Sequence, residues 1–206
     1  MKYFSLFSGI GGFELGIQQA YENTNVSSTT RYKQRGLDNE ESCALSKQKR
    51  MAVQQPNCIG FSEIDKYAVS IYQKHFPNHK NYGDITTINE RELPDFDLLV
   101  GGFPCPSFSI AGKRKGLEDV RGQLVFEIIR ILRGKKPKMF LLENVKGLLS
   151  HDKGKTMEII CEELCESGYA IDFEVLNSKN FGVPQNRERV FIVGKRLDTL
   201  PEGAIY

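Results

Sequence analysis

The amino-acid sequence predicts an α/β fold built on a doubly wound, mostly parallel sheet. Two observations lead to this prediction: short apolar runs alternate with helical stretches along the chain, and glycines follow the first and third of these runs. Strands that alternate with helices form βαβ units, and the right-handed crossover of such units covers both faces of the sheet. The 206 residues, 40% of them hydrophobic, are enough for one domain with its own core.

Six apolar runs have the length and composition of buried strands. We place them at residues 3–7, 59–64, 97–100, 139–142, 169–176 and 190–193. The third run is entered from Pro94 and left through Gly101 and Gly102, which act as breakers on either side of it. The stretches between the runs are expected to form helices at residues 13–20, 65–75, 123–132 and 156–167.

Residues 22–55 interrupt this alternation, because they are polar and contain a Ser-Ser-Thr-Thr segment at 27–30 and a Lys-Gln-Lys-Arg run at 47–50. We interpret them as an insertion in the loop after the first helix. The basic run is either a contact to phosphates or a solvated surface loop. The second interpretation is favoured, since runs of charge are usually solvated.

Composition excludes several classes of protein. The net charge of +2 favours no particular partner, and no apolar run is long enough to cross a membrane. The amino-terminal segment is a poor signal peptide, so an intracellular, cytoplasmic location is expected. The five cysteines show no Cys-x-x-Cys spacing, which argues against a disulfide framework or a zinc site; they are Cys43, Cys58, Cys105, Cys161 and Cys165.

The turn after the first strand reads Phe-Ser-Gly-Ile-Gly-Gly-Phe at residues 7–13, and glycines there let the backbone approach a ligand closely. Such a turn is a weak signal alone. Glu63 strengthens it, because a carboxylate after the second strand of a nucleotide-binding unit takes the ribose hydroxyls. Asp84 follows the helix predicted at 65–75 and is placed to accept a hydrogen bond from an adenine amino group. Both acids have an alternative role as helix N-caps, although Asp65 is better placed than Glu63 for that.

Cys105 lies between two prolines in Gly-Phe-Pro-Cys-Pro-Ser-Phe-Ser at residues 102–109, after the third strand. A buried structural cysteine is the usual alternative, but prolines stiffen this turn and present the thiol on a rigid loop. Glu143 follows the fourth strand, so parallel strands bring it to the same edge of the sheet. A carboxyl group at the end of an apolar strand is expected to hold a proton. Capping of the next turn is the alternative role for this acid, and Asn144 is equally suited to that.

Arg187 and Arg189 stand two residues apart in an extended segment before the last strand, so their side chains are expected to point the same way. One of them is placed to brace the catalytic loop and the other to meet a phosphate or a base. The alternative is a surface ion pair with Glu188.

With these segments in view, the chain resembles the DNA cytosine C5-methyltransferases along its length outside residues 22–55. The segments that carry the resemblance are, in order, Phe-Ser-Gly-Ile-Gly-Gly, Gly-Phe-Pro-Cys-Pro-Ser-Phe-Ser, Glu-Asn-Val and Gln-Asn-Arg-Glu-Arg. Each is moderately specific, and their order makes coincidence a poor explanation. The resemblance implies the Rossmann-like fold of S-adenosylmethionine-dependent methyltransferases.

The resemblance also implies a mechanism on double-stranded DNA, in which a Cys105 thiolate adds to C6 of a flipped cytosine and protonated Glu143 holds N3. A methyl group from S-adenosylmethionine then reaches C5. Residues 112–116 resemble the family's catalytic loop, which closes over the flipped base. Arg187 and Arg189 support this closed loop and the target nucleotide in this interpretation. Residues implied at the cofactor are Phe7, Gly9, Ile10, Gly11, Gly12, Glu63, Ile64, Asp84, Ile85, Pro104 and Leu124. Residues implied at the DNA are Ser107, Lys113, Arg114 and Lys115.

One departure from the family concerns the carboxyl terminus. Family members continue into a variable DNA-reading domain and a final motif, whereas this chain ends 12 residues after Gly194. We therefore expect the catalytic domain to occupy residues 1–206 and the isolated chain to methylate weakly or not at all. Either the chain is a truncated product, or a second polypeptide supplies target recognition. Methylation of tRNA and a non-catalytic remnant that binds cofactor or a partner remain alternatives. An RNA-type enzyme is disfavoured because Glu-Asn-Val lacks the second cysteine that such enzymes use, and no metal is expected.

Overall fold

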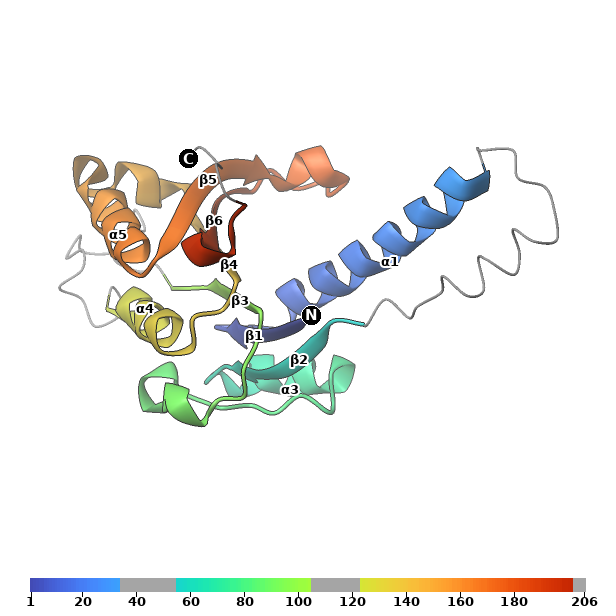
Figure 1. Cartoon of the computed structure of the whole chain (residues 1–206), viewed down its shortest axis with the longest axis horizontal. Helices are drawn as coiled ribbons and strands as arrows, with labels where there is room; N and C mark the ends of the chain where they lie inside the picture. Colours follow the sequence, from blue (N-terminus) through green and yellow to red (C-terminus); the bar gives the residue numbers. More distant parts are fainter. Residues whose placement is uncertain (34–54, 105–122, 202–206) are drawn as a thin grey trace.

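A computed structural model describes residues 1–33, 55–104 and 123–201 of the chain, with the side chains of 24–33 left out. Its centre is a six-stranded sheet in the order β2-β1-β3-β4-β6-β5 (Figure 1). The strands are β1 (Lys2–Leu6), β2 (Asn57–Ser62), β3 (Leu98–Gly102), β4 (Met139–Val145), β5 (Tyr169–Asn177) and β6 (Glu188–Arg196). β6 is antiparallel to both of its neighbours, while the other strands run in one direction. The predicted mostly parallel α/β sheet is confirmed.

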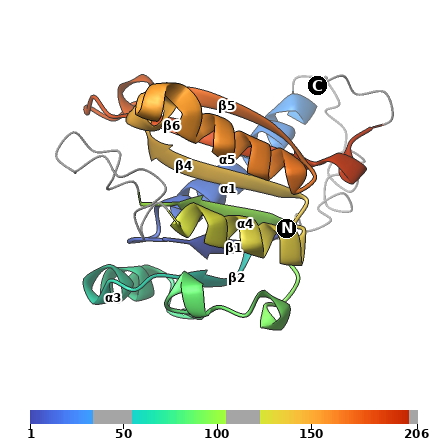
Figure 2. The same cartoon turned by 90° about the vertical axis from the view of Figure 1, so that its left-hand side faces the viewer.

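Helices cover both faces of this sheet. They are α1 (Gly12–Lys33), α3 (Lys66–His75), α4 (Leu124–Lys135) and α5 (Lys155–Glu166). Figure 2 shows α4 and α5 in front of the sheet and α1 behind it. Short 3₁₀ turns complete the connections: η1 (Ile85–Thr87), η2 (Glu90–Glu92), η4 (Lys146–Gly154), η5 (Ser178–Phe181) and η6 (Leu197–Thr199). None of the helices in the described parts combines the length and the apolar character that crossing a bilayer requires.

The core follows from the alternation of side chains along the strands. Phe4, Leu99 and Phe140 point toward α4 and α5 and are almost fully buried against Ile128 and Ile160. Burial of each such side chain is worth roughly 1.5–3 kcal/mol, so this face supplies most of the apolar stabilisation. A smaller cluster lies on the α1 side, where Tyr3, Leu98 and Val100 are buried with Phe13 and Ile17 packed against them.

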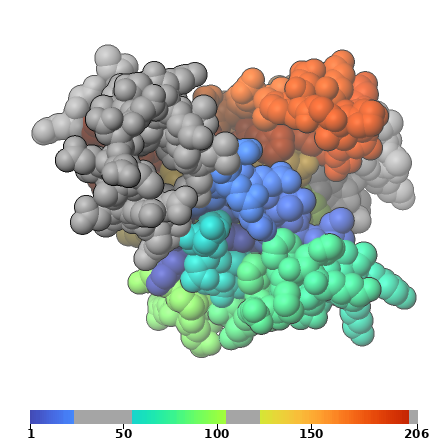
Figure 3. Space-filling model, turned by 90° about the vertical axis from the view of Figure 1, so that its right-hand side faces the viewer, coloured from blue at the N-terminus to red at the C-terminus, as the bar shows by residue number. Residues whose placement is uncertain are grey.

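The prediction of a loop insertion at 22–55 is wrong over its first part, because α1 continues to Lys33. The sequence offers a reason: neither glycine nor proline occurs between Gly16 and Gly36, so nothing breaks the helix that begins at Gly12. The described part of α1 projects between α3 and the η5 region (Figure 3). The basic run at 47–50 lies outside the described residues.

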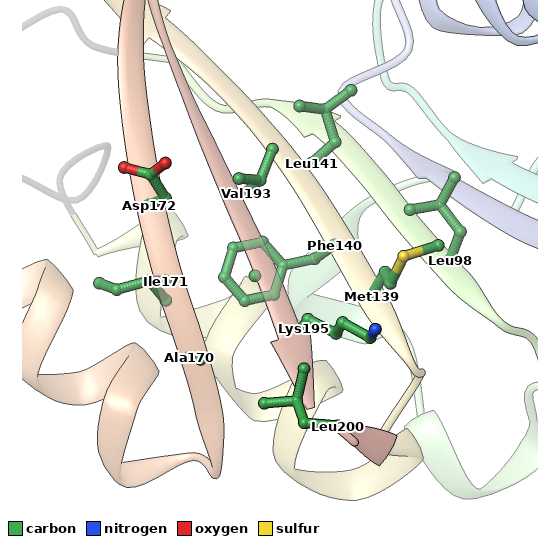
Figure 4. A pocket seen from close by; sticks show the side chains of 11 residues that line it. Leu98, Met139, Phe140, Leu141, Ala170, Ile171, Asp172, Val193, Lys195 and Leu200 are labelled. Carbon is green, nitrogen blue, oxygen red and sulfur yellow. The ribbon is translucent and has the colours of Figure 1, made fainter. Parts of the chain in front are cut away.

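Part of the sheet on the α1 side is apolar and open within the described part of the chain. Met139 and Val193 are 39% and 45% exposed there. With Leu98, Leu141 and Leu200 they line a hollow of about 470 Å³ (Figure 4). The hollow lies at the amino-terminal ends of β3 and β4, and none of the residues predicted for the functional site lines it.

A polar side chain is buried where α1 meets β1 and α3. Glu14, in the first turn of α1, is 1% exposed, and its Oε1 accepts a hydrogen bond from the Tyr72 hydroxyl at 3.0 Å. Its Oε2 and the Ser5 hydroxyl are buried and have no hydrogen-bond partner among the residues that the structure describes. Burial raises the pKa of the Glu14 carboxyl, and the Tyr72 hydroxyl opposes this effect. The fold therefore favours the protonated acid.

We expect Glu14→Gln to stabilise the protein, by an amount that grows as the pH rises. The folded-state pKa of Glu14 lies above its ordinary value, so the wild-type protein loses stability as the pH rises from about 4.3 through the raised pKa. Glutamine keeps the acceptor for Tyr72 and does not ionise, which removes this loss. Urea unfolding at pH 4 and pH 8 measures the effect.

Glu22→Gln is the matched control, because Glu22 is an exposed carboxylate on the same helix. Its effect on the free energy of unfolding should be small at both pH values. A Glu14→Gln protein less stable than wild type at pH 8 would contradict the prediction.

Candidate functional site

The carboxyl-terminal ends of β1, β3 and β4 lie together at one edge of the sheet, on the left in Figure 2. We call this edge the rim. In open α/β sheets, ligands bind at this edge because the loops that leave the strands converge there. The residues predicted for cofactor and catalysis, where they are described, follow or end these strands.

The glycine turn between β1 and α1 packs directly onto α3. Phe7, Gly9 and Gly11 have positive φ angles of 52°, 56° and 99°. At Gly11 an added Cβ would lie 2.7 Å from Cε2 of Phe76, so a larger residue does not fit. Ile10, by contrast, is 60% exposed at the tip of the turn. The turn thus packs its buried Gly11 against Tyr72 and Phe76 at the end of α3 and leaves the Ile10 side chain exposed.

Glu63 follows β2 and is held by backbone amides rather than by side chains. Its Oε2 accepts a hydrogen bond from the Gly9 N–H at 2.9 Å. Its Oε1 accepts from the N–H groups of Ile64 and Asp65, both at 2.9 Å. These bonds fix the orientation of the carboxylate. Because a carboxylate has further lone pairs, it can still accept hydrogen bonds from hydroxyl groups of a ligand.

The helix N-cap beside this carboxylate is Asp65, as the sequence favoured. Its side chain accepts from the N–H groups of Tyr67 and Ala68 at the start of α3. Asp65 thus satisfies the free amides of α3, and Glu63 remains available for the glycine turn. Ile64 is 71% exposed next to Glu63 and presents an apolar surface at the rim.

Asp84 and Ile85 were both predicted to contact the cofactor, but parts of their side chains are engaged elsewhere. Asp84 is the N-cap of η1, with its Oδ1 accepting from the backbone N–H and the hydroxyl of Thr86, both at 2.9 Å. The alternative role weighed for this acid is therefore realised by one of its oxygens. Ile85 is 2% exposed in the main core, so its side chain faces away from solvent and only its backbone can meet a ligand.

The remaining residues predicted at the cofactor are Phe7, Gly12, Pro104 and Leu124. Phe7 and Leu124 are half-buried against the main core, Leu124 as the first residue of α4. Pro104 is half-buried just beyond the end of β3. Gly12 begins α1 and has nothing within 4 Å of the place of a Cβ.

The predicted nucleophile Cys105 lies outside the described residues, as do Ser107, Lys113, Arg114 and Lys115. The chain that leads to Cys105 is described. Asn144 is 1% exposed, and its Nδ2 donates to the carbonyl oxygen of Phe103 at 3.1 Å. The strand register pairs Gly102 with Glu143. The segment that enters the Cys105 loop is therefore fixed beside Glu143.

Glu143 pairs with Arg189 across the sheet. The Arg189 Nε lies 2.8 Å from the Glu143 Oε1, and the two side chains are 21% and 24% exposed. The other carboxylate oxygen lies on the Gly102 side, where an added Cβ would be 3.1 Å from Oε2. The expectation of an apolar environment around this acid is wrong, because antiparallel β6 brings a guanidinium group to it.

The two arginines have different surroundings. Arg189 lies in β6, whereas Arg187 precedes the strand and is exposed, with its backbone N–H donating to Asn177 Oδ1 at 3.3 Å. The alternative of an ion pair between an arginine and the Glu188 carboxylate is wrong for Arg189, because Glu188 pairs with Lys146 at 3.0 Å. Arg189 donates instead to the Glu188 carbonyl oxygen at 2.8 Å.

The sequence analysis missed Asn81, which precedes Gly83 and Asp84. Its side chain bonds to the backbone of both Glu63 and Gly83. An asparagine close to a glycine signals a turn, but that signal alone does not identify which segments the side chain joins.

Comparison with known proteins adds a family to this geometry. A family model described as C-5 cytosine-specific DNA methylase matches residues 1–203. The orphan methyltransferase M.SPRI of Bacillus phage SPR is 45% identical over 202 residues, covering 97% of this chain and 39% of that protein. The type II methyltransferase M.NlaX of Neisseria lactamica is 42% identical over 193 residues, covering 94% and 51% respectively. The chain thus spans about half or less of the length of these relatives.

Two solved structures resemble the fold. A putative DNA modification methyltransferase encoded within an E. coli prophage gives a TM-score of 0.68 at 22% identity, covering 96% of this chain and 47% of that one. The S. pombe Dnmt2 methyltransferase gives 0.66 at 20% identity, covering 100% and 53%. At these identities the likeness establishes the shared fold alone.

We expect Gly11→Ala to lower the free energy of unfolding by at least about 1–2 kcal/mol, because the new Cβ meets the Phe76 ring and the backbone is left-handed. Gly16→Ala is the control: it lies in α1 with open space around it, and should stabilise by roughly 0.5–1 kcal/mol. Urea unfolding of the two variants measures both effects. Equal stabilities would show that the turn does not pack onto α3 as described.

Proposed function

The chain belongs to the family of C-5 cytosine-specific DNA methylases, and from this premise we propose that it carries out methyl transfer from S-adenosylmethionine to C5 of cytosine in double-stranded DNA. Because the chain spans only part of the relatives' length, activity, substrate and partners are all part of the proposal. The observation that carries it is the fixed position of Glu143 beside the segment that leads to Cys105.

The rim fits S-adenosylmethionine on chemical grounds. Glu63 presents an oriented carboxylate to a ribose, Ile64 presents an exposed apolar side chain to an adenine, and the glycine turn lies against this carboxylate through the Gly9 N–H. When bound, S-adenosylmethionine supplies an electrophilic methyl group. The residues of the chain would hold the adenosine part through Glu63 and Asp84, and the methionine part near Gly9 and Pro104.

Cys105 supplies the nucleophile in this proposal. Its thiolate adds to C6 of the cytosine, which turns C5 into a nucleophile with enamine character. After methylation, loss of the C5 proton and of the Cys105 sulfur restores the aromatic ring. The prolines on both sides restrict the backbone around this sulfur, which favours a single direction of attack.

Glu143 relieves the negative charge that addition creates on the ring. Its Oε1 is held by Arg189, which leaves Oε2, on the Gly102 side, to hold a proton against N3 of the base. Arg189 thus orients the acid. Because the base must leave the helical stack first, we also assign phosphate contacts to Lys113, Arg114 and Lys115, and contacts at the target nucleotide to Arg187 and Ser107.

A duplex containing 5-fluorocytosine tests the covalent step. Because the isolated chain is expected to methylate weakly, the test uses a long incubation with excess duplex and S-adenosylmethionine. The wild-type chain should then accumulate an adduct that survives denaturation, because fluorine at C5 blocks release of the sulfur. Cys105→Ala should form none, since the attacking atom is gone. Cys165→Ala is the matched control, because its thiol is exposed on α5 and the variant should react like wild type. Equal adduct yields from Cys105→Ala and wild type would overturn the assignment of the nucleophile.

The role of Glu143 predicts that its replacement lowers the rate of adduct formation and leaves the affinity for the cofactor unchanged. Glu143→Gln should slow adduct formation about 10²–10⁴-fold, because the amide cannot transfer a proton to N3. Its affinity for S-adenosylhomocysteine should stay near that of wild type, since Glu63 lies on another loop. Glu158→Gln, an exposed acid on α5, is the control for both measurements. A Glu143→Gln variant that forms the adduct at the wild-type rate would show that Glu143 has no catalytic role in the addition step.

A further inference from the structure

Asn81 joins two segments of the rim through three hydrogen bonds. Its Oδ1 accepts from the Glu63 N–H at 3.3 Å and from the Gly83 N–H at 2.9 Å. Its Nδ2 donates to the Glu63 carbonyl oxygen at 3.0 Å. The residue itself is anchored beside β2, because it forms an isolated parallel bridge with Phe61. One amide side chain therefore binds the backbone of Glu63 on both sides and the residue before Asp84.

The two segments so joined are the two walls proposed to hold the adenosine. Glu63 and Ile64 form one wall, and Gly83 with Asp84 forms the other. A further hydrogen bond joins the same two walls, because the Ser62 hydroxyl donates to the Gly83 carbonyl oxygen at 2.7 Å. Glu63 in turn bonds to the Gly9 N–H of the glycine turn. A shift at residue 81 would therefore change the spacing of the walls and the aim of the Glu63 carboxylate.

We propose that Asn81 is a positioning residue that sets the distance between the ribose-binding and adenine-binding walls of the S-adenosylmethionine site. This inference rests on the proposed function, because it takes the ligand from there. The chemistry selects asparagine at this position. An amide offers an acceptor for two N–H groups and, on a separate atom, a donor for a carbonyl oxygen, whereas aspartate would place a second acceptor against the Glu63 carbonyl.

Calorimetric titration of the 206-residue chain with S-adenosylhomocysteine tests this role. Asn81→Ala should weaken binding about tenfold or more, because three hydrogen bonds that order the walls are lost. Asn81→Asp keeps the two acceptor contacts but sets a carboxylate oxygen against the Glu63 carbonyl oxygen, so its affinity should also fall below that of wild type. At saturating S-adenosylmethionine, all three proteins should form the 5-fluorocytosine adduct at rates within about twofold of one another.

Asn89→Ala is the matched control. Asn89 is also a turn asparagine, with its Oδ1 accepting from the Arg91 N–H at 3.2 Å and its Nδ2 donating to Glu92 at 2.8 Å. It is the N-cap of η2, and within the described part of the chain its side chain bonds to η2 rather than to either wall. This variant should lose stability to a similar extent as Asn81→Ala and keep wild-type affinity. Affinity that falls equally in both variants would reduce Asn81 to a structural role and overturn the inference.

Two other outcomes separate this inference from the proposed function. If wild type binds the ligand and Asn81→Ala binds it equally well, the inference fails and the function stands. If wild type binds neither S-adenosylmethionine nor S-adenosylhomocysteine, the proposed function fails and takes the inference with it. Amide hydrogen exchange without ligand gives an independent readout, because the Gly83 N–H should exchange faster in Asn81→Ala than in wild type. Unchanged exchange would contradict the proposed hydrogen bonding of Asn81 between the two walls.

Discussion

The register between β3 and β4 places Gly102 directly beside Glu143, and the geometry of the rim depends on this pairing. Glycine at 102 leaves space for the carboxylate, whose Oε2 would lie 3.1 Å from a Cβ at that position. The next residue of β4, Asn144, points to the opposite face and binds the carbonyl oxygen of Phe103. Two consecutive residues of one strand therefore hold the acid and the entry to the Cys105 loop. A shift of one residue in this register would exchange their faces and separate the two groups.

Antiparallel β6 adds the third component of this arrangement. Because it lies between β4 and β5, its side chains on the α1 face stand next to those of β4, and Arg189 reaches Glu143 diagonally across the pair. The pair is partly shielded from solvent, with less than a quarter of either side chain exposed. In contrast, the pair between Lys135 and Asp95 has an aspartate that is 95% exposed, and such surface pairs contribute little to stability. The Glu143–Arg189 pair is better suited to orientation than to stabilisation.

The cofactor end of the rim is built mainly from backbone hydrogen bonds to a few polar side chains. Glu63, Asp65 and Asn81 each bind two or more backbone groups, and their partners belong to the glycine turn, to α3 and to the segment before η1. Beneath them, the Tyr72 hydroxyl joins α3 to Glu14 of α1. Loops alone would lose much conformational entropy on binding a ligand, and this network supplies part of that order in advance.

Local sequence patterns were sufficient to predict the α/β class, the approximate place of every strand and of most helices, the glycine turn and the role of Asp65 as a cap. These features depend on local periodicity and turn chemistry, which neighbouring residues encode. The length of α1 was not predicted, because its polar composition suggested a loop from residue 22 onward. Three contacts became apparent only in the folded chain: Arg189 pairs with Glu143, Ile85 packs into the core, and Asn81 joins Glu63 to Gly83. Each of those contacts joins segments whose relative position is set by strand register and by packing of the whole sheet, and the local sequence carries no direct record of either.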